Sequence, residues 1–211
     1  MGPRPMGARR KEASGHARPS REDFSAVDFA NTVACSACRA EDGLSDLASY
    51  RVWAARRRAV APGTVTSSQL AELRSLRGAV RDVFGTEVRG TEPSSLAIEA
   101  LNRASRRSVG TPILRRDRGH WSVRVTGETS ESVARFSGAI ARSAFATLTG
   151  TPGHHLRACL GPGCAHFLLA RTRTQRWCSP SGCGNRVRVA RHYWKKRSRG
   201  PGRSGRSRRG T

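Results

Sequence analysis

The chain has 211 residues, a length that suits one domain of ordinary size with a small appendage. Only 36% of the residues are apolar, which is low for a compact globular chain, so part of the length is expected to lie outside a core. No apolar run approaches the roughly 20 residues of a membrane span. Residues 1–21 are basic and rich in Pro and Gly, without the apolar stretch of a secretory signal. We therefore expect a cytoplasmic protein with no membrane partner, in which thiols stay reduced.

The net charge of +24 is concentrated in the last part of the chain. Residues 151–211 carry fifteen Lys or Arg and no Asp or Glu, whereas residues 22–150 carry eighteen and fourteen. A GC-rich genome that favours Arg explains part of this bias, but it does not explain the absence of acids after Glu131. A solubilising tail is the alternative. The pattern favours binding to a dense polyanion, most commonly nucleic acid, and hence association with the nucleoid.

Hydrophobic spacing predicts five helices and one hairpin after a disordered N-terminus at residues 1–21. The clearest helix follows Thr66 or Ser67, where apolar residues recur at three- and four-residue steps from Leu70 to Phe84. Two segments come before it and three come after it. In chain order these are a helix near Phe24–Thr32, a helix from Ser45 to before Pro62, a helix behind Pro93–Ser95, a hairpin over Thr111–Val125 and a helix over Ser130–Leu148.

These segments predict a mainly α (α+β) protein made of two parts. Residues 22–149 form a helical domain with one hairpin, long enough to bury a core of its own. Residues 150–153 read Gly-Thr-Pro-Gly and are predicted to be a linker. Residues 154–197 form a small unit that needs a metal ion or disulfides to fold. Residues 198–211 are a low-complexity tail rich in Arg, Gly and Ser, predicted to be disordered.

Four cysteines supply that stabilising site. Cys159 and Cys164 form one Cys-x4-Cys pair, and after thirteen residues Cys178 and Cys183 form another. Two close thiolate pairs separated by a dozen or more residues are typical of a closed tetrahedral zinc site, so we predict one structural zinc ion per chain. The alternatives are two disulfides or four idle thiols. The thirteen-residue arm is predicted to hold a hairpin that runs out over 166–169 and returns over 175–177.

Two motifs resemble known families. The stretch from Trp177-Cys178 to Cys183-Gly184-Asn185-Arg186 resembles the signature of the CGNR zinc finger. Asp28-Phe29-Ala30-Asn31-Thr32 resembles the opening motif of the ABATE-type domain that precedes such fingers, and Asp46-Leu47 with Trp53 resembles that domain's next stretch. The resemblance covers about residues 24–197. It implies a stress-induced transcriptional regulator whose finger binds DNA.

A basic helix is predicted directly after Cys183. Asn185 is expected to cap it, and Gly184 to let the chain leave the metal at an unusual angle. Its basic side is expected to contact DNA, with a solvated face as the alternative, and consists of Arg186, Arg188, Arg191, Lys195, Lys196 and Arg197. Its apolar side would consist of Val187, Ala190, Tyr193 and Trp194. Trp177 and Trp194 are interpreted as core aromatics of the finger.

The remaining candidates receive structural interpretations. Cys35 and Cys38 form a lone Cys-x2-Cys, interpreted as idle thiols, with a second metal or a redox pair as the alternative. His166 is interpreted as a hairpin residue and not as a surrogate ligand, because four cysteines already complete the site. Asp28 and Asn31 lie one helical turn apart, and they either line a pocket or form a buried polar pair. His154 and His155 are interpreted as part of the connection between the two units.

Together these observations predict a zinc-dependent DNA-binding protein that acts as a transcriptional regulator, with double-stranded DNA as its partner. The helical domain would bind a signal molecule, a partner or a second copy of the chain. One alternative is a protein that binds RNA or the ribosome. Another is a small-molecule-binding helical domain with a structural finger. No set of nucleophile, base and orienting group is visible, so we expect no enzymatic activity.

Overall fold

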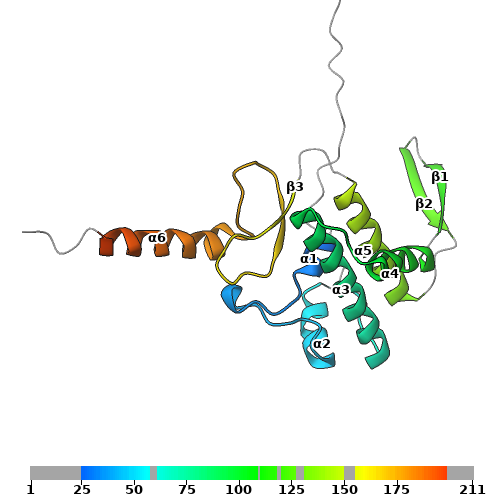
Figure 1. The fold of residues 1–211 in the computed structure, drawn as a ribbon. Coiled ribbons are helices and arrows are strands. Elements are labelled where there is room, and N and C mark those ends of the chain that lie inside the picture. Colours follow the sequence, from blue (N-terminus) through cyan, green and yellow to red (C-terminus); the bar gives the residue numbers. More distant parts are fainter. Residues whose placement is uncertain are drawn as a thin grey trace, which may run out of the picture.

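The structure is a computed structural model that describes residues 25–57, 61–108, 110–117, 120–126, 131–149 and 155–198, with the backbone alone over 111–126. The predicted N-terminal segment 1–21, the linker 150–153 and all but the first residue of the tail 198–211 lie outside these residues. The predicted fold class is confirmed, because a mostly helical region with one hairpin is followed by a small cysteine-rich unit (Figure 1).

Six α-helices and two short turns of helix make up the helical content of the described residues. The long helix α3 begins after Thr66, which forms a capping box with Gln69, and it ends at Gly90 in the left-handed region with φ of 67°. The helices are α1 (Ala26–Ala30), α2 (Leu47–Ala55), α3 (Ser67–Arg89), α4 (Ser95–Arg107), α5 (Ser132–Leu148) and α6 (Asn185–Ser198). The short turns are the 3₁₀ turn η1 (Ser36–Cys38) and the π-helical turn η2 (Pro180–Gly184).

Two antiparallel hairpins complete the described part of the chain. Strands β1 (Thr111–Asp117) and β2 (His120–Thr126) form the predicted hairpin. In the finger, β3 (His155–Ala158) pairs with β4 (Phe167–Ala170), with Leu156 opposite Leu169. The predicted pairing within the thirteen-residue arm is therefore wrong, and so is the interpretation of His155 as a simple connection. The strand before Cys159 pairs instead, because Gly161-Pro162-Gly163 allows the chain to reverse between the two strands.

The core lies where α1, α3 and α5 meet. Phe29 of α1 is fully buried and contacts Phe136 of α5 edge to face, with 5.6 Å between ring centroids. Phe167 of the finger belongs to the same buried cluster and packs edge to face on Phe84 of α3, at 5.8 Å. Leu156 and Leu169 also pack against this cluster. The finger hairpin therefore closes one side of the helical core.

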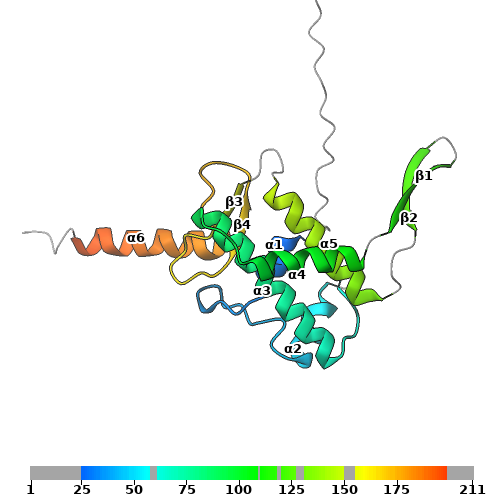
Figure 2. The ribbon, with the colours of Figure 1, turned by 45° about the vertical axis from the view of Figure 1, so that its right-hand side comes forward.

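The finger lies between the helical region and α6, and α6 projects outward from it (Figures 1 and 2). The β1–β2 hairpin leaves the helical region on the far side from α6 in both views. No helix among the described residues combines the length and apolar character needed to cross a bilayer.

Candidate metal centre and basic helix

The first cysteine pair lies in the loop that joins β3 to β4. The backbone N–H of Cys159 donates to the His166 carbonyl at 2.8 Å, and that of Cys164 donates to the Gly161 carbonyl at 3.0 Å. Gly163 takes a φ of 67°, which favours glycine. A Cβ on Gly161 would lie 2.9 Å from Cys183 Cβ and 3.0 Å from its Sγ. The loop therefore needs glycine at position 163 because of its backbone conformation, and at position 161 because a side chain there would collide with Cys183.

The second pair is held by a tight turn in front of α6. The Ser179 hydroxyl accepts a hydrogen bond from the Gly182 N–H at 3.0 Å, and the Gly184 N–H donates to the Ser179 carbonyl at 2.9 Å. Two predictions are wrong here. Asn185 has helical angles (φ −65°, ψ −44°), so the capping side chain is that of Ser179. Gly184 is not among the glycines with positive φ, so the chain leaves the cluster without an unusual backbone angle.

The sulfur atoms have the spacing of a tetrahedral zinc site. Zinc–sulfur bonds of about 2.3 Å place tetrahedral ligands about 3.8 Å apart. Cys178 Sγ lies 3.6 Å from Cys183 Sγ and 3.8 Å from Cys164 Sγ. Cys159 Sγ accepts the backbone N–H groups of Gly161 at 3.4 Å and Cys178 at 3.3 Å. Three of the predicted ligands, Cys164, Cys178 and Cys183, therefore meet at the turn η2, and Cys38 completes a group of four ligand atoms that lie within 4.8 Å of one another. Cys159 lies beside this group but is not part of it.

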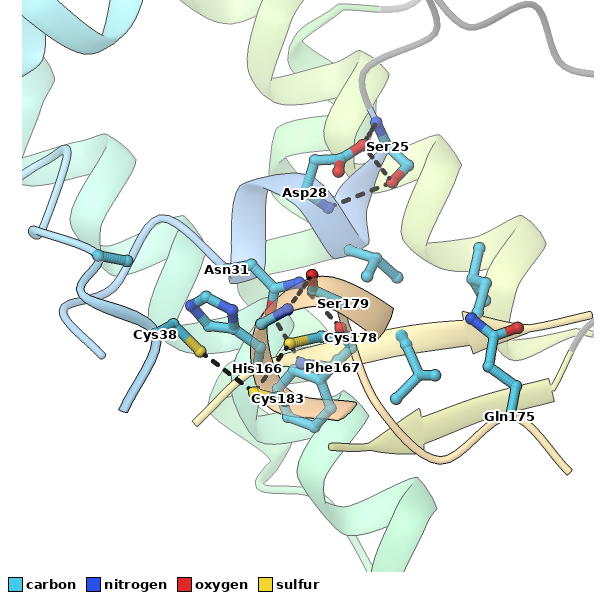
Figure 3. Close-up of a pocket in the computed structure, with 15 residues that line it drawn as sticks. Ser25, Asp28, Asn31, Cys38, His166, Phe167, Gln175, Cys178, Ser179 and Cys183 are labelled. Carbon is cyan, nitrogen blue, oxygen red and sulfur yellow. Dashed lines mark hydrogen bonds between the residues drawn. The ribbon is translucent and has the colours of Figure 1, made fainter. Parts of the chain in front are cut away.

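Two further thiols, from the helical region, reach the same place. Cys38 Sγ lies 3.6 Å from Cys183 Sγ, a contact drawn in Figure 3. Cys164 Sγ lies 3.3 Å from Cys38 Sγ and 3.9 Å from Cys35 Sγ. Sequence reasoning did not predict this approach, because more than a hundred residues separate the two motifs. The available signal was the Cys-x2-Cys spacing itself, which is typical of metal ligands.

Charge around the cluster also fits a bound cation. Burial raises the pKa values of Cys164 and Cys178 and keeps these thiols protonated unless a cation compensates. For Cys183 burial acts in the same direction, but hydrogen bonds from the thiols of Cys178, Cys38 and Cys164 outweigh it and lower the pKa to about 7. The Arg186 guanidinium donates to Cys183 Sγ at 2.9 Å. One predicted DNA-contacting residue therefore neutralises the cluster in this structure.

The motif at residues 28–32 joins the helical domain to the finger. The Asn31 amide donates from Nδ2 to the Phe167 carbonyl at 2.9 Å, and its Oδ1 accepts the Phe167 N–H at 2.8 Å. Asp28 caps α1 through a capping box with Ser25. The Thr32 carbonyl and hydroxyl accept bonds from Arg77, each at 3.2 Å. Each of these polar side chains therefore has a structural partner.

Asp28 and Asn31 also line a cavity of about 510 Å³ between α1 and the finger, together with His166, Phe167 and Gln175 (Figure 3). The volume is in the range of small-molecule sites. The polar groups of Asp28 and Asn31 are already engaged within the protein, in the α1 cap and in the bonds to Phe167. Asp28 is exposed and the two side chains bind different partners, so they do not form the buried polar pair that was the alternative to a pocket. Both residues line the cavity, and each also has a structural role.

Helix α6 has no buried residue. Trp194 is 64% exposed and Tyr193 is 55% exposed, so the prediction that Trp194 belongs to the finger core is wrong. Trp177 does pack against the cluster of buried cysteines, Leu168 and Ala170. The exposed rings of Tyr193 and Trp194 contact each other edge to face, and the Arg197 guanidinium lies 5.7 Å from each ring centroid.

These features define a class of protein in which a helical domain carries a metal-binding finger that ends in an exposed basic helix. Comparison with known families places the chain within that class. Residues 25–151 match the ABATE family, described as "Putative stress-induced transcription regulator", and residues 155–196 match the CGNR zinc finger. The chain therefore belongs to the ABATE family, and its finger holds a structural zinc ion. No curated protein matches the sequence.

Proposed function

We propose that the protein is a zinc-dependent transcriptional regulator that contacts duplex DNA with α6. The observation that carries this proposal is the helix itself. It is cationic, without a single acid, unburied along its length and anchored at one end by the zinc-binding turn. A closed site of four thiolates leaves no open coordination position, so the zinc supports structure and not catalysis.

A polyanionic partner would stabilise such a helix. Its fourteen residues span about 21 Å, and isolated helices of roughly 12–15 residues are marginal in water. Like charges on neighbouring turns weaken it further. A phosphate backbone removes that repulsion, and the major groove admits an α-helix. The partner that stabilises α6 best is therefore a duplex that receives the helix in its groove.

The charges of α6 do not have equal roles. Arg186 faces Cys183, and Arg197 stacks on Tyr193 and Trp194. Residues three, four and seven positions apart share one face of a helix, which groups Arg188, Arg191 and Lys195. We assign this face to DNA, with Lys196 contributing from the side.

Fluorescence anisotropy with labelled duplexes tests the assignment. A triple variant, Arg188→Ala with Arg191→Ala and Lys195→Ala, should bind more weakly at every salt concentration. The slope of log affinity against log salt should fall by about 2.7 if each residue neutralises one phosphate. The matched control removes three exposed charges from the helical region, namely Arg51, Arg56 and Arg103, and should leave the slope nearly unchanged.

Equal losses for the two triple variants would contradict the proposal, because α6 would then act only through net charge. RNA of the same sequence provides a second comparison. Binding to that RNA as tight as binding to the duplex would favour a role with RNA or the ribosome instead. Discrimination between DNA sites is expected from at least one side chain of this face, at about 1–3 kcal/mol for a base contact.

A further inference from the structure

The finger receives more metal ligands than one zinc ion can use. All six cysteines of the chain and His166 gather around the β3–β4 loop and the turn η2. Two overlapping groups of ligand atoms each lie within 4.8 Å of one another. One consists of Cys35, Cys38, Cys164 and His166, and the other of Cys38, Cys164, Cys178 and Cys183. A single tetrahedral ion takes four of these seven ligands and leaves three unused.

The backbone of the helical region presents Cys35 and Cys38 as a ligand pair. The Cys38 N–H donates to the Cys35 carbonyl at 2.9 Å, and Cys35 forms an isolated β-bridge with Ala40. Arg39 reverses the chain in the left-handed region with φ of 52°, an uncommon conformation for a residue other than glycine. This tight turn carries both sulfur atoms to the finger, within 3.9 Å of Cys164 Sγ.

His166 has the features of a metal ligand. Its Nε2 atom is buried and has no hydrogen-bond partner within the described part of the chain. The imidazole is hydrogen-bonded to the backbone of Val33, and with Nε2 unpartnered this bond falls to Nδ1. Metal-binding histidines commonly donate a hydrogen bond from the N–H of their second ring nitrogen to a backbone carbonyl, which fixes the orientation of the ring. A buried ring nitrogen without a partner otherwise costs stability.

We propose that Cys35, Cys38 and His166 hold a second zinc ion, which shares Cys164 with the zinc ion of the finger. Two tetrahedral ions that share one ligand need seven ligands, and seven are present. The group around the finger contains Cys38 and not Cys159, so the finger ion takes Cys159 in place of Cys38 when Cys38 binds the second ion. Cys159 Sγ is close enough for this exchange, because it already accepts the N–H of Cys178 at 3.3 Å. Thiolate and imidazole together are a donor set that suits zinc.

With two ions bound, six thiolates and two divalent cations leave a net charge of about −2 on the cluster. Two arginines are close enough to compensate this excess. Arg186 donates to Cys183 Sγ at 2.9 Å, and Arg81 donates to the carbonyl of Ala165, between Cys164 and His166, at 3.0 Å.

Metal content measured on the full chain under reducing conditions tests the proposal. Elemental analysis of the wild-type protein should give two zinc ions per chain. Cys35→Ser with Cys38→Ser should retain one, and His166→Ala should retain between one and two after dialysis against a weak chelator. Ser36→Ala, in the same exposed turn, is the matched control and should retain two. Titration of metal-free protein with Co²⁺, followed by thiolate-to-metal absorption, should reach its end point at two equivalents for the wild type and one for the double variant.

One zinc ion in the wild type would overturn the proposal, and that measurement does not depend on any variant folding. If the single ion survived the double substitution, Cys35 and Cys38 would be bystanders. If it were lost on Cys38→Ser alone, Cys38 would be the fourth ligand of a single site in place of Cys159. In the first case the finger would bind its zinc ion through the four predicted cysteines. In the second case Cys38 would replace Cys159 among those four ligands.

Discussion

Substituting Asn31 tests how the finger is attached to the helical domain. Asn31→Ala removes two hydrogen bonds to the backbone of Phe167, at 2.9 and 2.8 Å, both partly buried. A typical bond contributes about 1 kcal/mol, and an unsatisfied buried backbone group costs about 1–3 kcal/mol. Because water reaches part of this site, we expect a loss of about 2–3 kcal/mol in the free energy of unfolding of the zinc-loaded protein, measured in urea. Asn31→Asp should not restore it, because a carboxylate oxygen would then face the Phe167 carbonyl.

Hydrogen exchange shows whether Asn31→Ala loosens the finger locally or destabilises the whole protein. The Phe167 amide should exchange its hydrogen faster in Asn31→Ala, while amides in the middle of α3 keep most of their protection. Asn102→Ala is the matched control, since it removes the same amide from a half-buried position in α4. If both variants lost less than about 0.5 kcal/mol, the Asn31 contact would contribute nothing to stability and the reasoning would be refuted.

Three other perturbations follow from the geometry. Gly161→Ala places a Cβ 2.9–3.0 Å from the Cys183 side chain, so this variant should lose zinc to a chelator more readily than the wild type does. Gly184→Ala is the control, because its Cβ meets contacts of 3.4 Å or more and the variant should retain zinc nearly as the wild type does. Removal of zinc should expose the amides of β4 and η2 to hydrogen exchange while α3 stays protected, because the small unit lacks a core of its own; uniform loss of protection would contradict this. Burial raises the pKa of Tyr50 to about 12, so folding favours the protonated phenol. Its contribution to stability is complete below pH about 10, the pKa of an unperturbed tyrosine, and is lost as the pH rises toward 12. Unfolding at graded alkaline pH should show this loss in the wild type and a smaller one in Tyr50→Phe, which also loses the 2.6 Å bond to the Pro62 carbonyl.

The helices and the zinc site were predictable because their signals are local. The stripe from Leu70 to Phe84 repeats with the period of a helix, and Thr66 with Gln69 marks its start. Short spacing within each cysteine pair likewise predicts a metal site without knowledge of the fold. The finger hairpin was mispredicted because both candidate partners of Phe167–Ala170 are short, and pairing between short strands depends on tertiary packing and not on propensity.

Contacts between distant segments were not predictable from one sequence. Nothing near Cys35 or Cys38 shows that η1 lies against η2, and nothing near Asn31 shows that its amide binds Phe167. The exposure of Trp194 was missed for a related reason. An aromatic residue in a small unit normally belongs to its core, but this unit completes its core by packing Phe167 and Leu169 into the helical domain.

That arrangement links the stability of the finger to the helical domain. Among the residues that the structure describes, the finger's own cluster buries just four, namely Cys159, Leu168, Ala170 and Cys183. What holds the hairpin is therefore the metal on one side and the contacts of Asn31 and Phe84 with Phe167 on the other. Since Phe167 lies three residues from Cys164, loosening either attachment weakens the other, and linkage makes the effect reciprocal. A change in the packing of α1 should thus alter zinc retention, and loss of zinc should alter the packing of α1. Helix α6 begins directly after the turn η2 that carries Cys183, so the same coupling governs how firmly the basic helix is held.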